Sequence, residues 1–253
     1  MICSHRLICK TLKIKTSIRK RKKIKIPART ETEKSNARTL SGRIYRNYLN
    51  HDWILDDESY FTLDNSDING NDNFYSSNGS ATPNDVKYNP NQKFQLKLLV
   101  WIAIGSQYMS QIYIAPSKLA ITGEIYTNEC LRKRLVPFIN KHFKNKPYVF
   151  WPDKASAHYS KQAVEFLKAQ NITFIDKHDN PPNLPECRCI ENFWSCLKGI
   201  VYKDGWEAKN LDQLRNRIKN CLGKLEPDLV HSLTRGTNTQ LNAVQRLGVI
   251  EKR

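Results

Sequence analysis

Short runs of apolar and β-branched residues predict the strands of this chain. The longest runs from Phe94 to Gly105, and a shorter strand is expected from Ser110 to Ala115. Further strands are expected around Trp53, at Tyr148–Trp151 and at Ile172–Ile175. Their lengths are typical of strands in a globular domain.

Apolar residues at helical spacing predict at least four helices between these strands and after them. They are expected over residues 122–143, Ser160–Gln170, Ile190–Val201 and Leu211–Leu225. Thr122 is a suitable N-cap for the first of them, and Pro137 should kink or end it. In the second half a strand, a helix and a strand follow one another, which implies a parallel crossover and an α/β fold.

The charge of the chain is concentrated near its N-terminus. The net charge is +17, and residues 1–50 hold fifteen Lys and Arg against two acids. The densest run contains Arg19, Lys20, Arg21, Lys22, Lys23 and Lys25. Such a run is expected to bind nucleic-acid phosphates, with counterion release supplying the affinity, or to act as a nuclear-localisation signal. A solvated linker is the alternative interpretation.

Cysteine content and hydropathy argue against a protein built on disulfides or structural zinc and against a protein that spans a membrane. The seven cysteines form no regular disulfide or zinc-binding framework, so reduced thiols are expected. The most apolar run is far shorter than the roughly 20 residues that a membrane span requires. No membrane partner is therefore expected.

Three acidic residues lie in three separate local contexts that suggest a common site. Asp57 and Asp153 lie near runs of strand-forming residues, and Glu191 opens a helical stretch. Both aspartates are expected at or near strand ends. Carboxylates that converge from two strands and a helix suit Mg²⁺, which prefers oxygen ligands and keeps positions open for phosphate.

The sequence motifs around the second and third acids, Asp153 and Glu191, resemble those in the catalytic core of mariner-superfamily transposases. In that family the second Asp lies in an Asp-Asn-Ala-x-x-His phrase, and the third acid lies in a Pro-x-x-Pro-x-x-x-x-Ile-Glu-Asn-x-Trp phrase. The matching residues here are Asp153, Ala155, His158, Pro182, Pro185, Ile190, Glu191, Asn192 and Trp194. Lys154, Glu186 and Cys189 depart from the family's residues, and the spacer of 37 residues between Asp153 and Glu191 is longer than its commonest version.

The resemblance implies an RNase H-like fold, a mixed central sheet with helices on both faces. It also implies two regions. Residues 1–50 would be a basic linker with the remnant of a helix-turn-helix DNA-binding module, and residues 51–253 the DDE catalytic domain. The linker is expected to lead into a polar helix.

In function, the resemblance implies a cut-and-paste DNA transposase. Asp57, Asp153 and Glu191 would be both the catalytic residues and the ligands of Mg²⁺, which Mn²⁺ can replace. The partners would be double-stranded DNA, as transposon ends and as target, and the resemblance leaves a homodimer open. A nuclear location is expected.

Three alternatives stay open at this point. The chain could be a non-catalytic DNA-binding protein, a truncated or domesticated derivative of a transposase. Asp56, adjacent to Asp57, is a second candidate for the first acid, although the Asp-Glu-Ser-x-Phe context favours Asp57. His158 could be a core or capping histidine, or could lie near the scissile phosphate.

Overall fold

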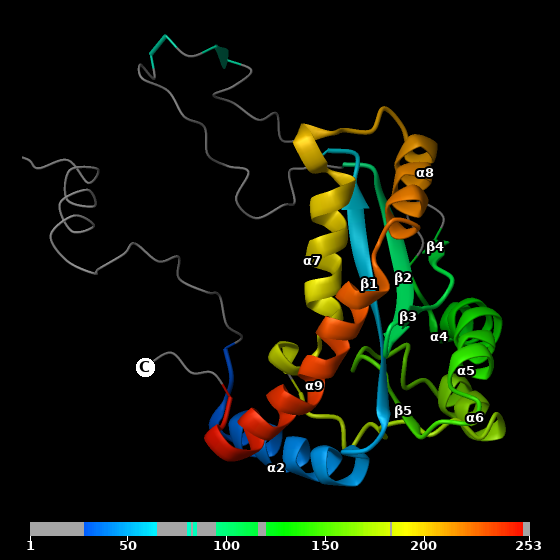
Figure 1. The fold of residues 1–253 in the computed structure, drawn as a ribbon, viewed down its shortest axis with the longest axis vertical. Helices are drawn as coiled ribbons and strands as arrows, with labels where there is room; N and C mark the ends of the chain where they lie inside the picture. Colours follow the sequence, from blue (N-terminus) through cyan, green and yellow to red (C-terminus); the bar gives the residue numbers. More distant parts are fainter. Residues whose placement is uncertain are drawn as a thin grey trace, which may run out of the picture.

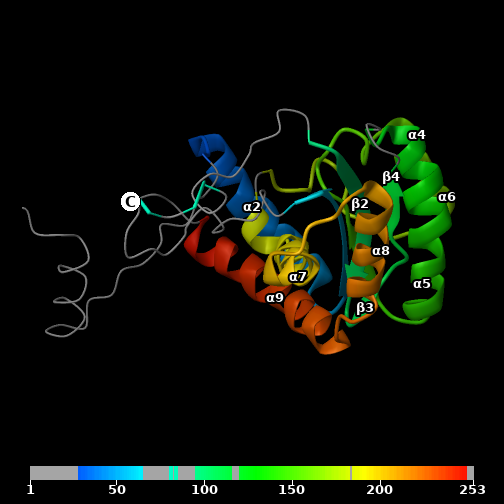
Figure 2. The same cartoon turned by 90° about the horizontal axis from the view of Figure 1, so that it is seen from above.

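A computed structural model describes residues 28–64, 80–81, 83–84, 95–115, 120–182 and 184–249. The basic run from Arg19 to Lys25 lies outside these residues. In the described part a central sheet is covered by helices on both faces, as Figures 1 and 2 show. The expected α/β class is confirmed.

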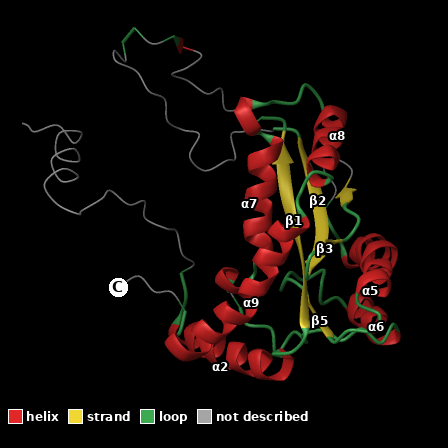
Figure 3. Ribbon diagram, in the orientation of Figure 1, coloured by secondary structure: helices red, strands yellow, loops and turns green. Residues whose placement is uncertain are grey.

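The sheet is mixed and has the order β3-β2-β1-β5, with β4 also paired to β2 (Figure 3). Strand β1 pairs antiparallel with β2 and parallel with β5. Eight of the nine residues of β2 are buried, because helices cover it on both sides. The strands are β1 (Asp52–Thr62), β2 (Lys97–Gly105), β3 (Tyr108–Met109), β4 (Tyr113–Ala115) and β5 (Tyr148–Trp151).

One face of the sheet packs against the C-terminal helices and α2. Trp53, Leu55 and Phe61 of β1 point to this side and join Phe193 and Leu197 in one hydrophobic cluster. The helices are α2 (Glu31–Tyr48), α7 (Ile190–Val201), α8 (Leu211–Leu222) and α9 (Pro227–Leu247), with short 3₁₀ turns at Pro185–Cys187 and Lys203–Gly205. Helix α9 was not predicted from the sequence, and it packs against α2.

The opposite face carries the helices between β4 and β5 and the helix after β5. They are α4 (Gly123–Ile125), the π-helix η1 (Tyr126–Leu135), α5 (Val136–His142) and α6 (Lys161–Ala169). Ile54 and Trp101 belong to the hydrophobic cluster on this side. Consecutive residues of β1 thus face two different cores.

Two expected elements differ from the structure. Pro137 does not end its helix, because Leu135 and Val136 keep helical dihedral angles and α5 continues directly from the π-helical turns of η1. The strand expected at Ile172–Ile175 is reduced to a single parallel bridge between Phe150 and Phe174. The crossover is parallel as expected, but the second strand has almost no ladder.

Helix α2 lies on the N-terminal side of the division expected at residue 50. It begins with a capping box formed by Thr30 and Glu33, and Arg38 donates hydrogen bonds to the carbonyls of Gln245 and Arg246 at the end of α9. The polar helix expected after the linker is thus present and packed on the domain. The division itself stays a prediction.

Candidate active site

The structure places the three predicted acids on three elements that meet. Asp57 lies in the middle of β1 rather than near its end, because β1 continues to Thr62. Asp153 follows the last residue of β5 by two positions, as expected. Glu191 is the second residue of α7, at the start of the helix.

Strand register and one helix contact bring these elements together. Leu55 pairs with Trp151 in the parallel ladder, so Asp57 and Asp153 lie the same distance beyond a shared pair. Trp194 of α7 donates its indole N–H to Oδ2 of Asp57 at 3.0 Å. Since Glu191 lies three residues before Trp194, one turn of helix carries it to the same region.

Arg188 lies between the three acid-bearing segments, just before α7. Its guanidinium donates to the backbone carbonyl of Asp56 at 2.6 Å, and to those of Pro152 and Trp151 at 3.2 and 3.3 Å. Its Nε lies 4.0 Å from Oδ1 of Asp153. This buried cation links the middle of β1 and the end of β5 to the segment just before α7.

The electrostatics of the site follow from this crowding. Burial raises the pKa of Asp57 to about 7; Arg188 opposes this rise, and the Asp153 and Glu58 carboxylates add to it. The pKa of Glu191 is raised as well, mainly by partial burial. The charged forms of both carboxyl groups are therefore disfavoured, mainly by burial, and Arg188 opposes this in each case.

The donor chemistry suits a divalent metal, because the side chains are carboxylates, the hard oxygen ligands that Mg²⁺ and Mn²⁺ prefer. Trp194 engages only one oxygen of Asp57. Within the described ranges, however, no three His, Cys, Asp or Glu side chains are grouped closely enough to hold an ion. Metal binding would therefore require these carboxylates to turn toward one another.

The two neighbouring aspartates of β1 have different environments. Asp56 is fully buried, and its Oδ2 accepts hydrogen bonds from Tyr126 at 2.6 Å and Trp101 at 3.0 Å. Its Oδ1 accepts the backbone N–H of Asp153 at 3.3 Å. Both oxygens are therefore engaged in holding the site, whereas Asp57 is the less enclosed of the two. The assignment of Asp57 as the first acid stays a prediction.

Comparison with known proteins extends this description. No family model matches the chain. Over 149 residues the chain is 26% identical to the Tc3 transposable-element transposase of Caenorhabditis elegans. The match covers 59% of this chain and 43% of that relative, so the chain spans less than half of the relative's length.

Solved structures of Mos1 transposase have the same fold. The paired-end complex with the left transposon end has a TM-score of 0.75 at 10% identity and covers 96% of this chain and 70% of that one. The catalytic domain of Mos1 mariner transposase has a TM-score of 0.64 at 9% identity, with 90% and 100% covered. The same domain with Raltegravir and Mg has a TM-score of 0.66 at 8% identity, with 89% and 100% covered.

This chain has the fold of a mariner-type transposase catalytic domain. The RNase H-like fold that the sequence motifs implied is confirmed, as is the resemblance to mariner transposases. Among the residues that the structure describes, no helix is both long and apolar enough to cross a membrane.

The histidine of the mariner-like phrase belongs to the buried network. His158 is 1% exposed, and its Nε2 lies 3.1 Å from Glu58 and 3.8 Å from Asp56. Burial lowers its pKa, but the Asp56 and Glu58 carboxylates outweigh this and raise the pKa to about 9. Of the two roles considered for His158, the structure places it in the core.

Lys154, which departs from the mariner pattern, does not intrude on the acids. Its ammonium donates to the carbonyl of Asn180 at 2.6 Å. The Asn180 side chain accepts from the Trp151 indole at 2.9 Å and donates to the Pro152 carbonyl at 3.0 Å. Asn180 therefore supports the turn that leads from β5 to Asp153.

The residues of the site that were not predicted from the sequence are Arg188, Asn180 and the pair formed by Asp56 and Tyr126. One signal was available for Arg188, since it lies between Cys187 and Cys189 in a run that reads as buried. A buried cation needs several acceptors. For Asn180 and Tyr126 the sequence holds no comparable signal, because their partners are far away along the chain.

Replacing Arg188 with Met should strongly destabilise the domain. Three backbone carbonyls would lose a charged donor, and we expect the free energy of unfolding to fall by about 3 kcal/mol. Arg215→Met is the matched control, because the one ion pair found for Arg215 among the described residues is a surface pair at 3.9 Å, whose loss should cost under about 1 kcal/mol. Urea unfolding measures both; similar values would contradict the central role of Arg188.

His158 should make stability depend on pH. Its pKa of about 9 in the folded state lies above the unfolded value, so its stabilisation is fully present below about pH 6.5 and is lost as pH rises through 9. The difference in unfolding free energy between wild type and His158→Gln should therefore shrink between pH 6 and pH 10, by on the order of 3 kcal/mol.

The control for this measurement is His178→Gln, since His178 is largely exposed. This substitution should change the unfolding free energy little, because the side chain is largely exposed. A difference for His158→Gln that is equally flat would show that the imidazole is not charged in the folded protein.

Proposed function

We propose that this chain is the catalytic part of a DDE transposase that cleaves DNA strands and joins a 3′-hydroxyl to target DNA. The observation that carries this proposal is the meeting of Asp57, Asp153 and Glu191 around Arg188, on β1, after β5 and at the start of α7. The likeness to Tc3 and Mos1 transposases supports it.

The three carboxylates would hold Mg²⁺, or Mn²⁺ in its place. When bound, such ions lower the pKa of water and stabilise charge that develops on a phosphodiester. Mos1 catalytic-domain structures contain Mn or Mg. Glu191 is exposed at the start of its helix and can turn toward the other two acids without repacking the core.

The chain's own residues would position this site. Trp194 fixes one oxygen of Asp57. The Asp56 carboxylate accepts the backbone N–H of Asp153 and so helps to fix the backbone at that residue. Arg188 would offset part of the negative charge and links the middle of β1 to the end of β5. The proposal needs no covalent protein intermediate, because water and a DNA hydroxyl serve as the nucleophiles.

The basic run near the N-terminus is proposed as a second DNA contact. Arg19, Lys20, Arg21, Lys22, Lys23 and Lys25 would neutralise backbone phosphates without reading sequence. The same run would direct the protein to the nucleus. The DNA bound in this way would be transposon ends and target.

Glu191→Gln should abolish metal-dependent nicking, because the amide removes a charged ligand while keeping the shape of the side chain. We expect the wild-type chain to nick supercoiled DNA weakly in Mg²⁺ or Mn²⁺, and the variant to fall at least tenfold. Glu207→Gln, an exposed acid near α8, is the matched control and should nick as wild type does.

If both variants nick equally, nicking does not come from this site. Absence of nicking in the wild-type chain, with DNA binding retained, would favour the alternative of a non-catalytic DNA-binding derivative. Unfolding curves recorded for each variant distinguish a lost ligand from a lost fold.

Replacing the six basic residues of the run with Gln should reduce the salt dependence of DNA binding. Each phosphate contact contributes about 0.9 to the slope of log K against log salt, so the slope should become smaller by up to about 5. A chain in which residues 1–26 are scrambled keeps the same charges and should keep the slope. An unchanged slope after replacement would place DNA binding elsewhere.

A further inference from the structure

The chain has a second basic segment, which lies within the described residues. Residues 51–253 hold 26 Lys and Arg against 22 acids, a net charge of +4. Residues 130–152 alone hold six Lys and Arg and no Asp or Glu, a charge of +6, so the rest of that part of the chain carries −2. These residues form most of η1, α5 and β5. The positive charge of the domain is therefore concentrated in one layer.

The three cations on η1 have partners within the fold. Lys133 and Arg134 pair with Glu129 at 2.5 and 3.3 Å. The Arg132 guanidinium lies over the ring of Phe166 at 4.6 Å from its centroid. These contacts hold η1 together and join it to α6, so the packing of this layer accounts for half of the basic segment.

The other three cations form what we call the lysine cluster, Lys141, Lys144 and Lys146, at the end of α5 and in the turn to β5. All three are exposed, and no ion pair of their ammonium groups is found among the described residues. The turn is closed by a hydrogen bond from the Lys146 N–H to the carbonyl of Phe143 at 3.0 Å. One short turn therefore presents three unpaired charges at one corner of the domain.

The imidazole of His142 reports how close these charges lie. Burial lowers the pKa of His142, and the charges of Lys141 and Lys146 lower it further. The ring is held in place by stacking on Tyr108, with 4.0 Å between the centroids. Lys141 lies in the last turn of α5, where a cation stabilises the helix. Lys144 and Lys146 lie beyond the helix, so helix stability does not explain them.

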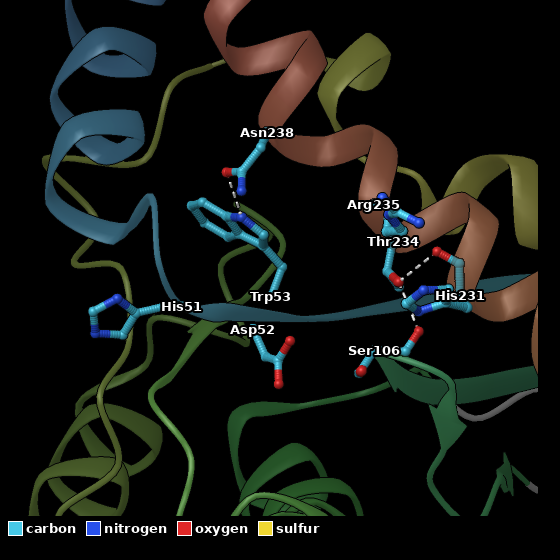
Figure 4. A pocket seen from close by; sticks show the side chains of 8 residues that line it. All are labelled: His51, Asp52, Trp53, Ser106, His231, Thr234, Arg235 and Asn238. Carbon is cyan, nitrogen blue, oxygen red and sulfur yellow. Dashed lines mark hydrogen bonds between the residues drawn. The ribbon is translucent and has the colours of Figure 1, made fainter.

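Asp52 is the acid that the sheet brings nearest to this turn. Its backbone N–H donates to the carbonyl of Pro147 at 2.9 Å. Its side chain lines a separate pocket together with residues of α9 (Figure 4), and no ion pair between Asp52 and the lysine cluster is found in the described part of the chain. Even with this carboxylate counted, the corner carries +2. It lacks a partner of opposite charge.

We propose that the lysine cluster binds backbone phosphates of duplex DNA. Basic side chains gathered on one face are the electrostatic signature of a nucleic-acid-binding surface, and lysines contact phosphates without reading sequence. Strand β5 leads from this corner to the candidate active site. Tyr148 and Asp153 are five residues apart, which spans at most roughly 17 Å, or about five base pairs. One duplex can thus reach both. The proposal rests on the proposed function in taking the DNA of that reaction as its ligand.

The test replaces the whole lysine cluster with Gln in the full chain and measures binding to a short duplex at several salt concentrations. The slope of log K against log salt should become smaller by up to about 3, because each lost phosphate contact removes about 0.9. Replacing Lys203, Lys209 and Lys224 with Gln is the control, since these exposed lysines change the net charge equally. It should leave the slope unchanged, as should replacing the lysine cluster with Arg.

Nicking distinguishes this contact from catalysis. At saturating DNA the Gln variant of the lysine cluster should nick at the wild-type rate, while the DNA concentration for half-maximal nicking should rise at least about tenfold. An unchanged salt slope in that variant, or an equal fall in the control, would overturn this proposal and leave the proposed function intact. A reduced slope with no nicking by the wild-type chain would support the lysine contact and contradict the proposed catalysis.

Discussion

The buried guanidinium of Arg188 is the constraint around which this domain is organised. Its guanidinium contacts the backbone of β1 and the backbone at the end of β5. Arg188 itself lies just before α7. A buried cation is tolerated only when its donors are satisfied. The chain must therefore bring the middle of β1 and the end of β5 to one point before α7 begins, and the position of Glu191 follows from that requirement.

The two faces of β1 place its neighbouring aspartates in different environments. Residues that face α7 place Asp57 beside Trp194, and residues that face η1 place Asp56 beside Tyr126 and Trp101. The buried network around Asp56 keeps its own charge balance through His158. As a result, Asp57, whose carboxylate lies nearer to solvent, follows a residue whose side chain is held by the aromatic donors Tyr126 and Trp101.

Much of this architecture could be predicted from the sequence. Apolar periodicity predicts strands β2 and β5 and helices α6 to α8. The sequence motifs around Asp153 and Glu191 identify these two residues as candidate acids of the site. Helix α9 was missed because it has many polar positions. The roles of Asn180 and Arg188 depend on contacts between distant segments, which no local pattern encodes. The length of β1 beyond Asp57 was also missed, because charged residues interrupt its apolar run.

The alternation of Asp56 and Asp57 on β1 has a consequence for changes in the register of this strand. Successive side chains of a strand face opposite ways, so a one-residue insertion or deletion upstream within β1 that shifts its register would move every acid of this run to the other face. After an insertion Asp56 would take the position of Asp57, and after a deletion Glu58 would take it. The three consecutive acids thus keep a carboxylate on the side of α7 through a one-residue slip of the strand.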